Sequence, residues 1–407
     1  MKTGLIINCV CTALLLFCGS GAADAQSGAI EPLFPCSEKL DNAVAVTAGI
    51  TRRSEDFNER DQVVADLLAL GIRSMKTGIY WDTFVRKGVL NYELTDPAME
   101  STRNSKLEMV NFFTYNNDAT HNSFVSPADF AYYVKKVVAR YKFYCMDWLV
   151  FQGVEYLSVN NRKITPDMYF SVLRNASRAV KEVGADHRVI MGGVTEVGRP
   201  FVDSLLSYGA LNYADIMHFS HSSYPEAVVD KFRKLRESEE KYAGRIAPVW
   251  MSYGYSSYPD LEDEQAMFLP RMYILSFACG ADKVFWEGYK CLEQNPKMRN
   301  HYSGLMHKDM TPKPAYYAME TMMKMMPNHC LRPKVSVQGG VYLAQWKDFE
   351  GKPVWAVWSP KEMEISLKID GKARFTDYKG NKMKIKAFTE AGPGVVYIQG
   401  AKNVNFE

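Results

Sequence analysis

Three side chains able to carry acid–base or nucleophilic chemistry stand at the ends of short apolar runs: Glu155, Tyr253 and Glu287. A carboxyl group can donate or accept a proton at a reacting oxygen. A tyrosine can act as a nucleophile, but its ordinary pKa of about 10 requires a nearby base, which Glu287 could supply. For Glu155 we favour a plainer interpretation, a loop carboxylate that accepts hydrogen bonds. Glu287 is expected to face a ligand, or else to bond a lysine or tyrosine.

Aromatic, amide and imidazole side chains accompany these candidates at the same run ends. An aromatic face can cover the apolar C–H face of a sugar ring, while amides and neutral histidines bond its hydroxyl groups. Core packing is the alternative, particularly for Trp250. Lys76 could favour an anionic sugar together with Arg52 and Arg53, although a salt bridge explains it more simply. The residues that we predict to bind a ligand are Lys76, Trp81, Asn116, Asn117, Gln152, His221, Tyr224, Tyr255 and Trp286.

Eight apolar runs must position these side chains. The run Val249–Tyr255 follows a proline and closes around Gly254, so it is too short for a helix, and its Val, Trp and Tyr content favours a buried strand. The other seven runs span residues 43–49, 73–80, 107–113, 148–154, 187–194, 215–219 and 282–286. Helix-like segments separate most of them, which predicts a parallel sheet. Eight such units predict a closed (β/α)₈ TIM barrel, whose chemistry lies in the loops after the strands.

The pattern changes near residue 334, where short strand-like runs alternate with turns. Val341–Trp346 and Pro353–Trp358 are examples, and Asp370-Gly371 is a typical turn dipeptide. We therefore predict a C-terminal antiparallel β-sandwich domain over residues 331–407, behind a barrel over residues 43–330. Residues 26–42 are expected to form a tether that closes the bottom of the barrel.

Composition limits the classes of partner. The chain has 407 residues, of which 47% are hydrophobic, and this is enough for one barrel and a small second domain. Its formal net charge is +3, from 49 basic and 46 acidic residues, with no basic stripe that could follow a phosphate backbone. We therefore expect no nucleic-acid partner. No His, Cys or carboxylate cluster has metal-ligand spacing, so we predict neither a metal nor a cofactor.

The N-terminus has the layout of a secretory signal. Lys2 precedes an apolar stretch from Leu5 to Cys18, and Ala23-Asp24-Ala25 provides small residues for cleavage after residue 25. The apolar stretch is shorter than the roughly 20 residues of a membrane-spanning helix, and no other run of that kind is present. We predict an exported protein, periplasmic or extracellular. A lipoprotein attached through Cys18 ranks second, because Phe17 is bulky where a small residue is usual.

Five cysteines remain after removal of this signal: Cys36, Cys145, Cys279, Cys291 and Cys330. Since five is odd, at least one thiol is free or pairs outside the chain. We expect Cys145 and Cys279 to be buried apolar thiols.

Several local patterns, in order along the chain, are similar to one enzyme group. They are Lys76–Trp81, Tyr169–Gly193, Asp215–Tyr224, Gly304–Asp309 and Lys313–Tyr316. Together they resemble the retaining glycoside hydrolases that join a (β/α)₈ barrel to a C-terminal β domain, most closely the β-xylosidase and α-L-iduronidase group. The resemblance covers about residues 43–400. It implies this fold and an oligosaccharide or polysaccharide ligand.

The sequence departs from that group at both catalytic positions. In the group the fourth strand ends in Trp-Asn-Glu-Pro, whose glutamate is the general acid/base, and alignment from Trp148 places Gly153 there. The seventh strand of the group reads Trp-x-Thr-Glu, whose glutamate is the nucleophile, and alignment from Trp250 places Tyr253 there. Retention requires two carboxyl groups about 5 to 5.5 Å apart. Neither replacement supplies one.

Three functions remain open. We favour a carbohydrate-binding protein on a glycosidase scaffold that lacks the ordinary mechanism, because a shifted loop could restore only one of the two lost positions. The alternative is an active glycosidase with relocated catalytic residues, drawn from Glu155, Glu287 and Tyr253. A structural or protein-binding role is the third, if Tyr253, Tyr255 and Tyr289 fill the cleft.

Overall fold

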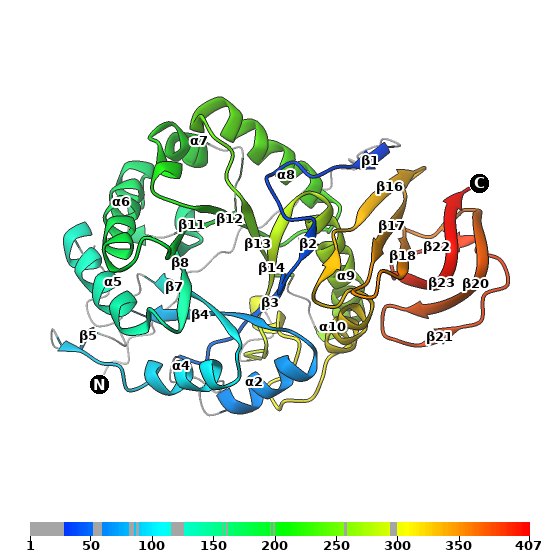
Figure 1. The fold of residues 1–407 in the computed structure, drawn as a ribbon, viewed down its shortest axis with the longest axis horizontal. Coiled ribbons are helices and arrows are strands. Elements are labelled where there is room, and N and C mark those ends of the chain that lie inside the picture. The colour runs from blue at the N-terminus through cyan, green and yellow to red at the C-terminus, as the bar shows by residue number, and fades with distance from the viewer. Residues whose placement is uncertain are drawn as a thin grey trace, which may run out of the picture.

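The computed structural model describes residues 28–51, 59–80, 85–86, 89–114, 126–156, 158–159, 162–195, 197, 200–255, 259–293 and 299–407. Its larger part is a closed barrel ringed by helices, and a smaller sheet lies against one side, drawn in orange and red (Figure 1). Within the described residues, no helix has both the length and the apolar character needed to cross a membrane. The predicted signal segment lies outside the described residues.

The barrel consists of eight parallel strands, which close in the order β11-β12-β13-β14-β3-β4-β7-β8. This confirms the eight-strand prediction, with small differences at the strand ends. The strands are β3 (Val44–Thr47), β4 (Ser74–Tyr80), β7 (Glu108–Thr114), β8 (Cys145–Gln152), β11 (Arg188–Val194), β12 (Ile216–His221), β13 (Val249–Tyr253) and β14 (Ala281–Glu287).

Helices cover the outside of the barrel. They are α2 (Arg60–Ala69), α4 (Thr95–Asn104), α5 (Pro127–Tyr141), α6 (Pro166–Val183), α7 (Pro200–Ser207), α8 (Ala227–Ser238), α9 (Glu262–Ala278) and α10 (Pro314–Met325). Helix α5 shows why they begin where they do: Ser126 Oγ caps the Asp129 N–H at 3.1 Å, and Pro127 occupies the first turn. A π-helical segment, Glu239–Ala243, extends α8.

Strand alternation divides the apolar side chains between two cores. One set fills the barrel interior and comprises Ala45, Val110, Leu149, Ile190, Ile216, Trp250 and Phe285. The other set lies between the barrel and the helices and includes Tyr253 and Trp286. Because successive side chains point to opposite faces, Ser252 shares the interior with Trp250, whereas Tyr253 faces the helices.

The C-terminal domain is a seven-stranded antiparallel sheet in the order β1-β16-β17-β18-β23-β20-β21. Its strands are β1 (Gly28–Ile30), β16 (Lys334–Gln338), β17 (Val341–Lys347), β18 (Pro353–Trp358), β20 (Leu367–Asp377), β21 (Lys382–Met383) and β23 (Val396–Phe406). A short pair, β19 (Met363–Glu364) with β22 (Glu390–Ala391), adds a second layer. Part of the predicted tether thus forms an edge strand of this sheet, since β1 pairs with β16.

The remaining strands form isolated two-stranded ladders. They are β2 (Lys39–Leu40) with β15 (Cys330–Leu331), β5 (Val85–Arg86) with β6 (Val89–Leu90), and β9 (Ser158–Val159) with β10 (Arg162–Lys163). All five cysteines of the described chain are free thiols. Cys145 and Cys279 are buried, as predicted, and burial raises the pKa of each to about 12.

Candidate functional site

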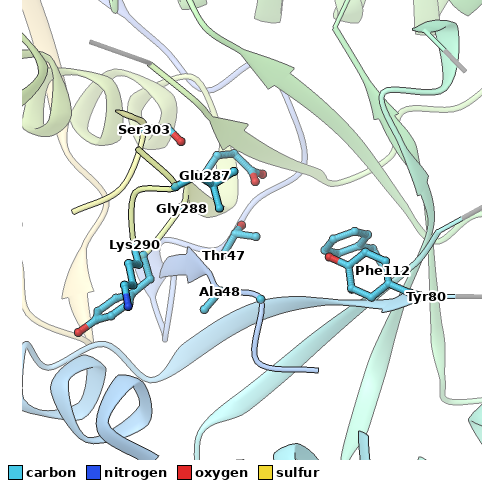
Figure 2. Close-up of a pocket in the computed structure, with 12 residues that line it drawn as sticks. Thr47, Ala48, Tyr80, Phe112, Glu287, Gly288, Lys290 and Ser303 are labelled. Atoms are coloured by element: carbon cyan, nitrogen blue, oxygen red, sulfur yellow. The ribbon is translucent and has the colours of Figure 1, made fainter. Parts of the chain in front are cut away.

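A cavity of about 250 Å³ opens at the carboxyl ends of β3, β4, β7 and β14. Figure 2 shows Glu287 and Thr47 on one side of it, and the rings of Tyr80 and Phe112 on the other. The two rings meet edge to face, with centroids 6.4 Å apart. The cavity is lined by Thr47, Ala48, Gly49, Gly78, Tyr80, Phe112, Glu287, Gly288, Tyr289, Lys290, Leu292 and Ser303.

Lys76 is the centre of a polar network beneath this cavity. Its ammonium is fully buried and donates to Ser252 Oγ at 2.8 Å, to Gln152 Oε1 at 3.1 Å and to the Glu287 carboxylate. Burial lowers the pKa of Lys76, and the Glu287 carboxylate opposes that effect. Three donors and three acceptors therefore satisfy the ammonium completely.

Glu287 carries this network into the cavity wall. Its Oε1 accepts from Lys76 and from Gln152 Nε2, the latter at 3.1 Å. Both of these bonds use Oε1, so Oε2 makes no hydrogen bond with a described residue, and the side chain is 21% exposed. The structure thus places a carboxylate oxygen where a ligand hydroxyl could donate to it. Three sequence-predicted residues, Lys76, Gln152 and Glu287, meet at this point.

His218 extends the network and was missed by the sequence analysis. Its Nε2 lies 2.9 Å from Ser252 Oγ. Ser252 Oγ also accepts from Lys76, so this serine links the ammonium to the imidazole, whose second nitrogen is Nδ1. That nitrogen has no partner among the described residues, and burial lowers the pKa of His218 well below its ordinary value. Strand alternation could have identified His218 from the sequence. It follows the interior residue Ile216 by two positions, so its side chain points to the same face.

Glu155 has a different environment from Glu287. It follows β8 in a short 3₁₀ turn, Val154–Tyr156, and its Oε1 accepts from both the backbone N–H and the hydroxyl of Thr195, the latter at 2.6 Å. Nearby, the Gly153 N–H donates to the Gly193 carbonyl at 2.6 Å. These bonds join the loop after β8 to the end of β11 and to Thr195, which follows it. Glu155 is not among the residues that line the cavity.

Tyr253 is fully buried on the helix-facing side of β13. Its hydroxyl donates to the Ser223 carbonyl at 3.1 Å, and burial raises the pKa of the phenol well above its ordinary value. Its ring stacks on His221 and Tyr255 and meets Trp286 edge to face. Tyr253 does not line the cavity either, so the structure does not bring it to Glu287.

The other predicted ligand-binding residues are dispersed. Burial lowers the pKa of His221 to about 4, and its Nε2 lies 2.9 Å from the Tyr224 carbonyl. The Tyr224 ring is 64% exposed and packs against Phe268. Trp286 donates to the Ser303 carbonyl at 2.9 Å. Tyr255 bonds Glu264. Trp81, Asn116, Asn117, Arg52 and Arg53 lie outside the described residues.

Lys290 is a further cavity residue that the sequence analysis missed. Its ammonium donates to Glu59 Oε2 at 2.5 Å. Thr47 was missed too, and its buried hydroxyl has no partner among the described residues. Both residues lie at or just beyond a barrel-strand end, where the fold predicts chemistry, but neither forms a motif. No group of His, Cys, Asp or Glu able to hold a metal occurs in the described part of the chain.

Comparison with solved structures finds glycoside hydrolases of families 39, 30 and 51. A family 39 glycoside hydrolase from the gut symbiont Bacteroides cellulosilyticus WH2 matches with a TM-score of 0.70 and 17% identity, over 88% of this chain and 81% of that one. A glucosidase from Croceicoccus marinus matches with a TM-score of 0.68 and 13% identity, over 93% and 99% of the two chains.

A monomeric β-xylosidase from Caulobacter crescentus CB15 gives a TM-score of 0.64 at 13% identity, over 89% of this chain and 97% of the xylosidase. At such low identities these matches show a shared fold and no more. Comparison with protein-family models and with curated proteins finds no match.

Proposed function

We propose that this chain is a glycoside-hydrolase-like protein that binds an oligosaccharide or polysaccharide at the carboxyl end of its barrel and does not cleave it by the two-glutamate mechanism. The observation that carries this proposal is the network around Lys76. Glu287 is the acidic residue among the described residues of the cavity wall, and its carboxylate accepts from Lys76 and Gln152. The ends of β8 and β13 bring Gln152 and Ser252 to this network instead of carboxylates.

Glycoside hydrolysis normally uses two carboxyl groups, about 5 to 5.5 Å apart for retention and about 6.5 to 9.5 Å apart for inversion. Glu287 is suited to accept hydrogen bonds, because its neighbours Lys76 and Gln152 both donate to it. Glu155 bonds Thr195, and the Tyr253 phenol bonds Ser223. These contacts support a binding role over the alternative of relocated catalysis, which no described contact favours.

The cavity wall suits a sugar ring. Phe112 and Tyr80 offer aromatic surface for its C–H face, and Glu287 Oε2 can accept from a hydroxyl group. A volume of about 250 Å³ is just below the roughly 300–1,000 Å³ of typical small-molecule sites, which is consistent with one sugar unit held at a time.

The test is a combined binding and turnover assay on the mature chain from Gln26 onward. Xylo-, gluco- and arabino-oligosaccharides are measured by calorimetry, and these together with aryl glycosides are examined for released product. We expect binding without product, and a loss of at least about tenfold in affinity for Glu287→Gln, because a hydrogen bond to a charged group contributes about 1.5–3 kcal/mol.

Glu108→Gln is the matched control. Glu108 accepts from Lys283 at 3.0 Å at the opposite end of the barrel, in the same kind of buried-lysine pair. This variant should bind as the wild type does. Product formation by the wild type, abolished in the Glu155→Gln, Glu287→Gln double variant, would establish relocated catalysis. A folded wild type that neither binds nor cleaves any of these ligands would refute the carbohydrate role.

We further propose that the chain is exported, on the strength of its N-terminal signal pattern. N-terminal sequencing of the protein secreted by a bacterial host should begin at Gln26. Retention of residues 1–25 would contradict this proposal, and a lipid-modified Cys18 would replace it with a lipoprotein.

A further inference from the structure

Among the described residues, two lysine–glutamate pairs contribute charge at the cavity, whose lining includes Glu287 of one pair and Lys290 of the other. Lys76 pairs with Glu287, and Lys290 pairs with Glu59 at 2.5 Å. Each ammonium has its own carboxylate partner, so the two pairs together carry no net charge. A ligand therefore encounters no uncompensated positive charge from either lysine.

The exposure of the two pairs is unequal. The side chains of Lys76 and Lys290 are 0% and 4% exposed, whereas those of Glu287 and Glu59 are 21% and 35% exposed. Charges interact most strongly at short distance and where water does not screen them. At the Glu287–Lys76 pair, a bound sugar would therefore lie closest to the carboxylate, with the ammonium behind it, whereas Lys290 lines the cavity with its charge already paired to Glu59.

Lys76 cannot serve as an anion receptor in this arrangement. Its three N–H donors are occupied by Gln152, Ser252 and Glu287, and its ammonium is fully buried. An anionic ligand could reach it only by displacing Glu287. The salt bridge that the sequence analysis considered as the simpler account of Lys76 is the one present.

We propose that this cavity accepts neutral sugar units and rejects uronic acid units, with Glu287 as the residue that sets this specificity. The inference rests on the proposed function and specifies the sugar class that the same site takes. A neutral sugar can donate a hydroxyl hydrogen to Glu287 Oε2. A uronate carboxylate has no hydrogen to donate and places a second negative charge beside the first, which is unfavourable.

The experiment compares sugars that differ only in the group at C6. D-glucose, D-glucuronate and D-glucuronamide form one set and the corresponding galacto sugars a second, because the amide reproduces the shape of the uronate without its charge. Affinities are measured by calorimetry or ligand-observed NMR on the full mature chain at pH 7. We expect the amide to bind much as the parent sugar does, and the uronate at least about tenfold more weakly. Added salt should narrow that difference.

Variants then assign the effect to Glu287. In Glu287→Gln, the affinities for the amide and the uronate should differ by no more than about threefold. Glu108→Gln, at the other end of the barrel, should leave the ratio of these two affinities unchanged. Since Glu287→Gln leaves the Lys76 ammonium unpaired, the Lys76→Met, Glu287→Gln double variant removes both charges and should give the same narrowed ratio.

The outcomes separate the two proposals. Uronates that bind as tightly as their amides, or more tightly, would overturn the specificity inference and leave carbohydrate binding intact. If the ratio of the amide affinity to the uronate affinity is unchanged in both Glu287 variants, Glu287 is not the residue that discriminates against uronates. Failure of the folded wild type to bind any sugar, in this set or among the oligosaccharides above, would refute the proposed function together with the inference.

Discussion

Buried lysines in this barrel are matched to carboxylates. Lys76 pairs with Glu287, and three further lysines follow the same rule: Lys283 with Glu108, Lys290 with Glu59 and Lys313 with Glu262. Removal of an ammonium from water is costly unless a carboxylate and hydrogen-bond acceptors replace the solvent. At the residue scale, this requirement explains why Glu287 is paired with Lys76. Because Oε1 is used in that pair, Oε2 is the oxygen that remains for a ligand in the cavity.

Glu239 is a buried carboxyl group that does not belong to any of these four pairs. It is fully buried in the π-helical segment after α8, accepts from the Ala247 N–H at 2.9 Å and has no ion pair among the described residues. Burial raises the pKa of its carboxyl from 4.5 to about 7, against the opposing effects of that N–H, Arg245 and Arg236. The folded protein therefore holds a proton at Glu239 that the unfolded chain releases at lower pH.

We predict that this carboxyl makes the protein less stable as pH rises from about 4.5 to about 7. In this window the folded state binds more protons than the unfolded state, so the unfolding free energy falls, by at most about 3 kcal/mol. Glu239→Gln should remove this dependence and be the more stable protein at pH 8. Chemical denaturation of the wild type and of Glu239→Gln at pH 5 and pH 8 measures the unfolding free energies. An equal change in unfolding free energy between the two pH values in both proteins would show that the burial of Glu239 has no such effect.

Strand geometry decides which candidates meet. Leu149 and Gln152 both reach the barrel interior although they are three residues apart, which strict alternation does not allow. A left-handed backbone at Phe151, with φ of 66°, accompanies this irregular end of β8. Gln152 consequently bonds Lys76, while Glu155 turns towards Thr195. At the element scale, the bend of one strand end therefore determines which carboxylate lies at the cavity.

Beside this irregular end of β8, the neighbouring strand β11 has a glycine, Gly192, at a position with no room for a side chain. The Gly192 N–H donates to the Tyr169 hydroxyl, which in turn donates to the Val150 carbonyl. A Cβ on Gly192 would lie 2.6 Å from both oxygens. We predict that Gly192→Ala lowers the unfolding free energy by about 1–3 kcal/mol, because the overpacked site cannot relax without breaking these bonds.

Denaturant unfolding of Gly192→Ala against Gly28→Ala measures this effect. A Cβ on Gly28 would meet nothing within 4 Å, so the control should unfold close to the wild type. A Gly192→Ala protein as stable as that control would show that β11 can shift away from Tyr169.

At the scale of the whole molecule, one buried ion pair joins the barrel to the C-terminal sheet. Arg271 of α9 makes a bidentate pair with Glu226, at 2.9 and 2.5 Å, and also donates to the Pro393 carbonyl at 3.3 Å. Trp358 of β18 donates to the same glutamate at 3.0 Å. The Arg271 side chain is 1% exposed. Both domains therefore contribute to a single desolvated cluster.

We predict that Arg271→Met destabilises the protein by about 3–5 kcal/mol, because it leaves Glu226, whose side chain is only 15% exposed, without its counter-charge. The barrel and the sheet should lose structure in one transition at a lower midpoint. Thermal unfolding followed by far-ultraviolet circular dichroism and tryptophan fluorescence tests this. Lys135→Met removes the exposed Lys135–Glu182 pair and should change stability by less than about 1 kcal/mol. Two separate wild-type transitions would show that the domains unfold independently.

The sequence by itself determined the architecture. Eight short apolar runs separated by helical segments, followed by turn-punctuated strands after residue 334, predicted the barrel and the C-terminal sheet because apolar periodicity is a local property of the chain. Among the residues that the sequence identified, Glu287 ends β14 in the cavity wall and Lys76 lies within β4 beneath it, and the interior position of both follows from the same fold.

Only the tertiary structure decided which side chains meet. Tyr253 and Ser252 are adjacent in sequence, yet one packs beneath the helices and the other bonds Lys76 in the barrel interior. The partner of Glu287 lies on a strand 211 residues away. Strand parity, the left-handed backbone at Phe151 and the cost of burying an unpaired ammonium fix these contacts. Each contact joins residues on different strands, and the local pattern of apolar runs does not specify which residues of two strands meet.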